Sequence, residues 1–211
     1  MKEEAEKLLI EKAMQGDLNA FEVLVKQYEG KVFAVAYRLC GDRQEGEDLA
    51  QEAFLKAWRG LSKFRGEAAL ATWLVTIVTN IWRDRQRRHQ LKSVSLDEPK
   101  SFEDGEVFYQ VSDQGPGPEA LYETKELQQQ LQALINELKP EFRMVLVLRD
   151  IQGYSYEEVA NMTQTSLGTV KSRINRARNY LKDKVMAARE QIENQSRLSE
   201  QKEYLETGGE A

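Results

Sequence analysis

The sequence contains one cysteine, one histidine and four prolines among 211 residues. A single cysteine excludes an intramolecular disulfide, and Cys40 and His89 together cannot supply the four ligands of a zinc site. No Ser–His or Cys–His pair for nucleophilic catalysis can be argued either. We interpret Cys40 as a small apolar residue near a helix end and His89 as a polar surface group, and we expect no metal and no cofactor.

Long hydrophobic runs are also missing. The longest stretch without a charged residue, residues 68–82, is shorter than the roughly 20 apolar residues that a membrane-spanning helix needs. The first residues, MKEEAEKLLIEKAMQGD, lack the basic start and apolar run of a secretory signal. Together with a mean hydropathy of -0.63, these features predict a cytoplasmic protein that does not insert into membranes.

Charged residues are unevenly distributed, although the net charge is only -5. Residues 83–92 hold five bases against one acid, and residues 171–184 hold six bases against one acid. Residues 93–117 hold six acids against one base, and residues 190–211 hold six acids against two bases. The overall negative charge therefore does not exclude nucleic-acid binding by the two basic segments.

Helical periodicity runs through the first 92 residues, and no strand pattern interrupts it. Apolar residues recur at intervals of three and four over residues 18–39, with Asp17 as the predicted N-cap and Gly41 as the predicted end. These helices would close one small all-helical domain, residues 1–92. The other helices are expected at residues 3–15, 44–61 and 70–90, with a loop at 63–70 broken at Gly66.

The second half of the chain begins where this periodicity stops. Residues 93–117 are acidic and end in the sequence GPGP, which indicates a flexible linker. A second domain is predicted over residues 118–188, with Pro118 and Pro140 each opening a helix. We expect the acidic tail, residues 189–211, to fray. The predicted fold class is all-α, with two small helical domains joined by a flexible linker.

Two helices around a tight turn are predicted within SYEEVANMTQTSLGTVKSRINRARNYL, residues 155–181. Ser155 and Glu158 have the spacing of a capping box. The second helix has an apolar stripe and an opposite face of hydroxyl, amide and guanidinium groups, which suits the major groove of duplex DNA better than an ordinary solvated surface. The stripe is Val170, Ile174, Ala177 and Leu181, supported by Val159 and Ala160; the opposite face is Thr169, Ser172, Asn175, Arg176 and Asn179, flanked by Lys171 and Arg173.

Two surfaces of the first domain also call for a function. Leu55 lies among charged residues on its helix, as in a solvated face or in a small protein-docking patch. The helix at 70–90 has a polar and basic stripe beside Trp73, with Trp82 expected well away from the core face, and these tryptophans suit either a core or a stacking platform for single-stranded nucleic acid. The stripe is Thr72, Thr76, Thr79, Arg83 and Gln86, bordered by Asn80.

A family resemblance is carried by the segments EDLAQEAFLKAWRGLSKFRGEAALATWLVTIVTNIWRDRQRR and LKPEFRMVLVLRDIQGYSYEEVANMTQTSLGTVKSRINRARNYL. They resemble the two sequence blocks of bacterial RNA polymerase sigma factors of the extracytoplasmic function (ECF) group. The resemblance implies a non-enzymatic factor that binds core RNA polymerase and directs it to promoters. It implies that the upstream (minus-thirty-five) element is read as duplex and that melted bases of the downstream (minus-ten) element are captured. It also implies an anti-sigma partner, which the family commonly has.

The resemblance assigns residues to three surfaces, and Val75 departs from it because the family has a bulkier residue there. Polymerase docking falls to Asp48, Gln51, Glu52 and Leu55. The minus-ten element falls to Lys63, Phe64, Arg65, Gly66, Glu67, Trp73, Asn80, Arg83, Arg87 and Arg88, with Thr76 added from the polar stripe. The minus-thirty-five element falls to Thr169, Lys171, Ser172, Arg173 and Arg176.

Two functions of other classes remain as alternatives. A free-standing helix-turn-helix regulator would bind operator DNA as a dimer, with the first domain as sensor or dimeriser. An enzyme acting on nucleic acid would need a carboxylate or His/Cys cluster, and a nucleotide hydrolase would need a sequence such as GxxxxGK[ST], which is absent. Transcription from a linear promoter by core polymerase and this chain would distinguish all three.

Overall fold

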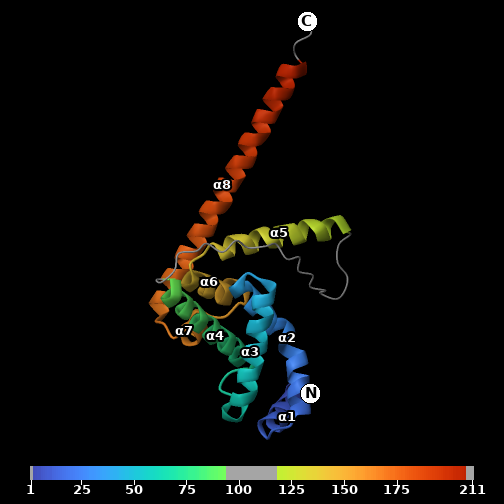
Figure 1. Cartoon of the computed structure of the whole chain (residues 1–211), viewed down its shortest axis with the longest axis vertical. Coiled ribbons are helices and arrows are strands. Elements are labelled where there is room, and N and C mark those ends of the chain that lie inside the picture. The colour runs from blue at the N-terminus through green and yellow to red at the C-terminus, as the bar shows by residue number, and fades with distance from the viewer. Residues whose placement is uncertain (1, 94–117, 208–211) are drawn as a thin grey trace.

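The computed structural model describes residues 2–93 and 118–207 (Figure 1). Within these ranges the chain forms helices and no strands, which confirms the predicted all-α class. None of the described helices combines the length and the hydropathy that a membrane crossing requires. The predicted linker lies outside the described residues except for Ser93, the last residue of a helix.

The first four helices pack around α2, which contacts α1, α3 and α4. The predicted caps of α2 are confirmed: the Asp17 carboxylate accepts hydrogen bonds from the amides of Asn19 and Ala20, and Gly41 ends the helix at a φ of 79°. A short 3-10 helix, η1, was not expected from the sequence. The elements are α1 (Lys2–Met14), α2 (Leu18–Cys40), α3 (Arg43–Gly60), η1 (Leu61–Lys63) and α4 (Leu70–Ser93).

The second group of helices is built around the predicted helix-turn-helix. Pro140 occupies the first turn of α6, as predicted, and after Leu146 the chain passes into a wider π-helical turn, η2. The elements are α5 (Pro118–Asn136), α6 (Pro140–Leu146), η2 (Val147–Ile151), α7 (Tyr156–Thr163) and α8 (Leu167–Thr207).

The C-terminal helix α8 is much longer than expected. The prediction that the tail frays is wrong for residues up to Thr207, because α8 continues that far and projects out of the body (Figure 1). The physical reason is visible in the sequence: residues 182–207 are rich in Lys, Glu, Gln, Ala and Arg and contain neither glycine nor proline. The first glycine after the domain is Gly208.

The two groups of helices pack directly on each other, and their buried residues form one cluster. Helix α4 is covered by α2 and α3 and also by α6 and α7. The expectation that Trp82 lies away from the core is therefore wrong, since its side chain is only 2% exposed. Thr79, expected on a polar stripe, is also buried, and its hydroxyl donates to the carbonyl of Val75 at 2.8 Å. Val75 is itself fully buried, so no bulkier side chain is needed there.

Hydrogen bonds to helix ends join the two groups. Arg143 of α6 donates to the carbonyl of Leu39 at 2.8 Å and also to the carbonyls of Asn136 and Leu138. The buried Gln132 of α5 accepts a hydrogen bond from the Arg38 side chain of α2 at 3.0 Å and donates to the Arg38 carbonyl at 3.4 Å. The last carbonyls of a helix have no partner within the helix, so these contacts satisfy groups that would otherwise be unpaired.

Candidate nucleic-acid and polymerase interfaces

The helix-turn-helix is fixed by side-chain caps at the start of both helices. Ser155 accepts a hydrogen bond from the amide of Glu158 at 3.1 Å, and the Glu158 carboxylate accepts from the amide of Ser155 at 2.7 Å, which confirms the capping box. Helix α7 ends at Thr163, and the C-cap residue Gln164 has a left-handed φ of 54°. Ser166, a cap not predicted from the sequence, accepts a hydrogen bond from the amide of Thr169 at 3.2 Å at the start of α8.

Helix α8 is held by the apolar stripe that the sequence predicts. Val170, Ile174 and Ala177 are buried, and Leu181 is half-buried where the helix leaves the body. Val159 on α7 is buried behind them. On the opposite face, Ser172, Asn175, Arg176 and Asn179 are exposed, while Thr169 and Arg173 are half-buried.

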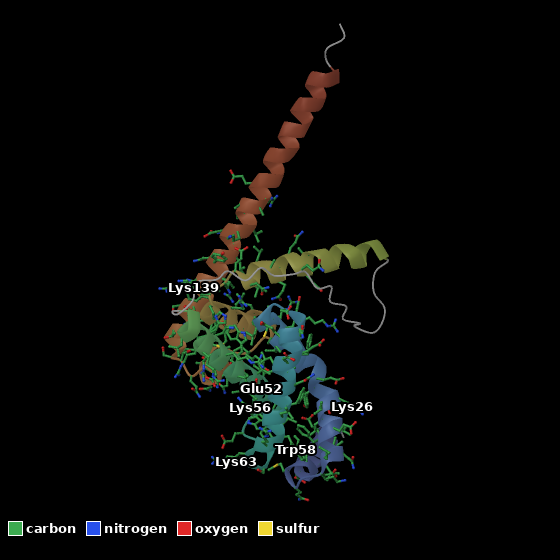
Figure 2. All side chains as sticks on the ribbon, viewed as in Figure 1. Lys26, Glu52, Lys56, Trp58, Lys63 and Lys139 are labelled. Carbon is green, nitrogen blue, oxygen red and sulfur yellow. The ribbon has the colours of Figure 1, made fainter. Side chains whose placement is uncertain are left out.

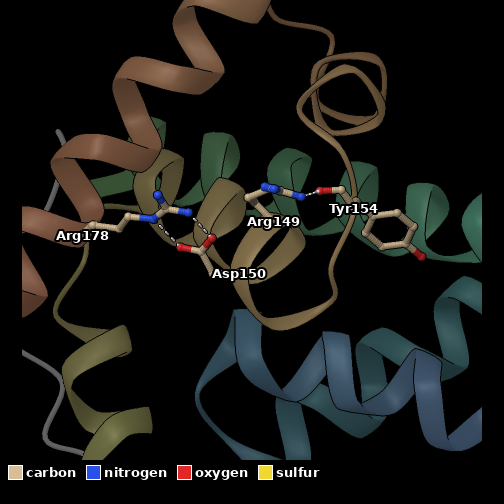
Figure 3. Close-up of polar contacts among 4 residues, drawn as sticks. All are labelled: Arg149, Asp150, Tyr154 and Arg178. Carbon is tan, nitrogen blue, oxygen red and sulfur yellow. Dashed lines mark hydrogen bonds and ion pairs between the residues drawn. The ribbon is translucent and has the colours of Figure 1, made fainter.

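Basic side chains of α8 meet residues from η2 and α7. The Arg178 guanidinium forms two parallel hydrogen bonds with the Asp150 carboxylate, at 2.6 and 2.8 Å (Figure 3). Lys171 lies 5.8 Å from the ring centre of Tyr156, and Arg149 lies 4.7 Å from the same ring. Arg149 also donates to the carbonyl of Tyr154 at 2.8 Å, which ties η2 to the segment before α7 (Figure 3).

The predicted polymerase-docking residues share one face of α3. Asp48, Gln51 and Leu55 are exposed, and the Leu55 side chain is 58% exposed among them. Glu52 is half-buried and accepts a hydrogen bond from Arg85 of α4 at 2.7 Å; Lys56 lies one turn further along α3 (Figure 2). Burial acts to raise the pKa of Glu52, but the nearby Arg85 and Lys56 outweigh it and lower that pKa. The carboxylate therefore stays charged beside the exposed leucine.

The loop between η1 and α4 is anchored at one end by aromatic packing. Phe64 is half-buried and packs against Trp73 of α4, with ring centres 5.2 Å apart. The other predicted loop residues, Lys63, Arg65, Gly66 and Glu67, are exposed. Gly66 has a φ of 70°, a conformation that favours glycine, and it turns the exposed part of the loop.

The predicted minus-ten residues on α4 differ in how accessible they are. Arg87 and Arg88 are exposed near the end of the helix. Trp73, Thr76 and Asn80 are half-buried, and Asn80 Oδ1 has no hydrogen-bond partner in the described part of the chain. Arg83 is half-buried and donates to the carbonyl of Thr163, the last residue of α7, at 3.2 Å. Arg83 therefore contacts the second group of helices in this arrangement.

The remaining candidates for reactive chemistry are the single cysteine and any cluster of metal-binding side chains. Cys40 is half-buried at the end of α2, as interpreted from the sequence, and burial raises the pKa of its thiol to about 12. Among the described residues, no three His, Cys, Asp or Glu side chains gather in a way that could hold a metal ion.

Comparison with known proteins places two family models on the chain. The model of sigma-70 region 2 matches residues 24–92, which span most of α2 through α4. The model of sigma-70 region 4 matches residues 128–181, which end within α8.

Curated relatives extend the similarity over most of the chain. The RNA polymerase sigma-H factor of Pseudomonas aeruginosa is 36% identical over 180 residues, covering 83% of this chain and 91% of that protein. The ECF RNA polymerase sigma-E factor of Escherichia coli K12 is 36% identical over 184 residues, covering 85% and 94%.

Solved structures share the fold. The sigma factor RpoE of Bartonella quintana, in complex with the anti-sigma factor NepR, superposes with a TM-score of 0.58 at 25% identity, covering 79% of this chain and 96% of that chain. CnrH, in complex with the cytosolic domain of CnrY, gives a TM-score of 0.58 at 26% identity, covering 87% and 98%.

Proposed function

Because this chain belongs to the ECF group of the bacterial sigma-70 family, we propose that it reads an upstream promoter element as duplex DNA and captures melted bases of a downstream element. The observation that carries the proposal is the face of α8. Arg176, Asn175 and Ser172 are exposed on a helix whose other side is buried. These side chains can meet base edges in the major groove while the buried stripe holds the helix in place.

Downstream capture would use the loop after η1 and the adjoining surface of α4. Trp73 and Phe64 form an aromatic pair at the base of an exposed loop, and Arg87 and Arg88 are exposed further along α4. Flipping a base out of the duplex costs a few kcal/mol, and stacking on an aromatic side chain recovers about 1 to 3 kcal/mol per base. Binding of unpaired bases can therefore drive melting without hydrolysis, so the factor acts without catalysing a reaction.

Docking on core RNA polymerase would use the face of α3 around Leu55. Leu55 is exposed, and the acidic side chains of Asp48 and Glu52 lie beside it. This face therefore suits a partner surface with an apolar contact for the leucine and basic residues around it. Such a partner would hold the factor in the cytoplasm with the transcription machinery. An anti-sigma factor is a second proposed partner, because the similar RpoE was solved with one.

The test is transcription from linear DNA by purified core polymerase and the full-length chain. A library of genomic promoter fragments should give RNA with defined start sites, and permanganate should modify unpaired thymines near those starts. RNA synthesis that is no more selective than with core polymerase alone would overturn the proposal. Binding to a palindromic duplex as a dimer, without polymerase, would support the regulator instead.

A further inference from the structure

Some basic side chains of α8 between residues 171 and 184 are paired with a carboxylate, and others are not. Arg178 and Lys184 are each held by a carboxylate from outside the helix, Asp150 of η2 and Glu137 just after α5. Arg173 and Arg176, in contrast, form no ion pair or hydrogen bond within the described ranges. The basic side chains of α8 are thus partly neutralised by carboxylates of the protein itself.

The Arg178–Asp150 pair has the more constrained geometry. Nε donates to Oδ2 at 2.8 Å and Nη2 donates to Oδ1 at 2.6 Å, so both carboxylate oxygens hold the fork of the guanidinium (Figure 3). The Arg178 side chain is 49% exposed, and exposed pairs typically contribute about 0.2 to 1 kcal/mol to stability, with bidentate pairs such as this one contributing more. The pair therefore ties η2 to α8, and this structural role is compatible with a second one.

The position of Arg178 on α8 points to this second role. It follows Lys171 by seven residues, which on an α-helix places the two within about 20° of the same side and roughly 10 Å apart along the axis. Lys171 flanks the proposed DNA-reading face. An unpaired guanidinium at Arg178 would lie on that same flank and could reach a phosphate of the bound duplex.

We propose that Asp150 is a positioning residue for promoter discrimination, which holds Arg178 away from DNA phosphates. This inference rests on the proposed function. A phosphate contact strengthens binding to every sequence, because phosphates carry no base information. By neutralising Arg178, Asp150 lowers the affinity of α8 for DNA of any sequence. A larger share of the binding free energy then comes from base contacts, such as those proposed for Arg176.

The test measures the salt dependence of sequence-independent binding. Full-length wild-type and Asp150→Asn chains are titrated onto a labelled duplex of about 30 base pairs with an arbitrary non-promoter sequence, in about 50 to 200 mM KCl. The variant should bind several-fold tighter at low salt, and its slope of log K against log salt should be steeper by about 0.9. A merely structural role would lower the melting temperature and weaken binding without steepening the slope, and that result would overturn the inference.

Two matched variants sharpen the result. Asp150→Asn combined with Arg178→Gln should return the slope to the wild-type value, because the freed cation is removed. Glu137→Gln removes the ion pair of Lys184, which lies six residues beyond Arg178, about 120° around the helix from it, and stays near the Tyr180 ring. This variant should leave the slope unchanged, and an equal steepening by both freed cations would overturn the specific role of Asp150.

Discrimination itself is measured with the holoenzyme on a promoter selected by the transcription experiment. The ratio of promoter to non-promoter occupancy should fall several-fold for Asp150→Asn. A wild-type holoenzyme that selects no promoter would overturn the proposed function. A selective wild type with an unchanged ratio in Asp150→Asn would overturn only the role of Asp150.

Discussion

The guanidinium of Arg143, in α6, donates a hydrogen bond of 2.8 Å to the carbonyl of Leu39, the penultimate residue of α2. The same side chain donates to two carbonyls around the end of α5. Arg143, which lies within the region 4 match, thus donates hydrogen bonds to carbonyls at helix ends in both halves of the molecule.

Replacement of Arg143 by alanine should lower the free energy of unfolding by about 3 kcal/mol, because several part-buried carbonyls lose a charged donor at once. Urea denaturation followed by circular dichroism measures the change. Arg59→Ala, at an exposed position of α3, is the control and should stay within about 0.5 kcal/mol of wild type. Equal stabilities of the two variants would contradict the role given to Arg143.

Leu55→Asp should abolish association with core polymerase and leave the fold intact. The side chain is 58% exposed, so the substitution removes a docking contact without opening the core. Co-purification with core polymerase measures binding, and thermal melting checks the fold. Leu18→Asp, at a 63% exposed leucine of α2, is the matched control and should still co-purify. Retention of Leu55→Asp by the polymerase would rule out this docking face.

Arg176→Ala should weaken holoenzyme binding to promoter DNA by about 1 to 3 kcal/mol and relax base preference at one position of the upstream element. Lys171→Ala should instead weaken binding to all sequences and make the salt slope shallower by about 1, as expected for a phosphate contact. Competition among promoter variants in a binding titration separates these results. A uniform loss for Arg176→Ala would show that it contacts phosphate rather than a base.

Cys40 should be unreactive in the folded protein at pH 8, because burial raises the pKa of its thiol to about 12 and keeps it protonated. Ellman's reagent should modify it rapidly only after denaturation, with Cys40→Ala as the blank. The folded state holds this proton more tightly than the unfolded state. Its contribution to stability is therefore complete below the unfolded pKa near 9 and declines as the pH rises toward 12. Fast modification of the native protein would contradict the burial of this thiol.

Local signals predicted much of this fold. Asp17, Gly41 and Ser155 mark helix ends by side-chain or backbone chemistry within a few residues, and each was assigned correctly. The burial of Trp82 could not be predicted in the same way, because it depends on a second group of helices covering α4. The Asp150–Arg178 pair joins residues 28 positions apart, and helical periodicity alone does not reveal such contacts.

For the proposed interfaces too, the sequence predicted features set within one helix and missed those set by contacts between the two groups of helices. Helix periodicity put Asp48, Gln51 and Leu55 on one face of α3, and the structure has them exposed together. The engagement of Arg83 by the carbonyl of Thr163 had no signal in the sequence, since it depends on how the two halves meet.

The length of α8 has a mechanical consequence. A helix of 41 residues spans roughly 60 Å, and its N-terminal end carries the face proposed to enter the DNA groove. A straight helix of that length magnifies small tilts: a rotation of about 10° at the groove, with the helix kept straight, would sweep the opposite tip through roughly 10 Å. The tip is therefore a natural place for a distance probe that reports the angle at which the factor sits on its promoter.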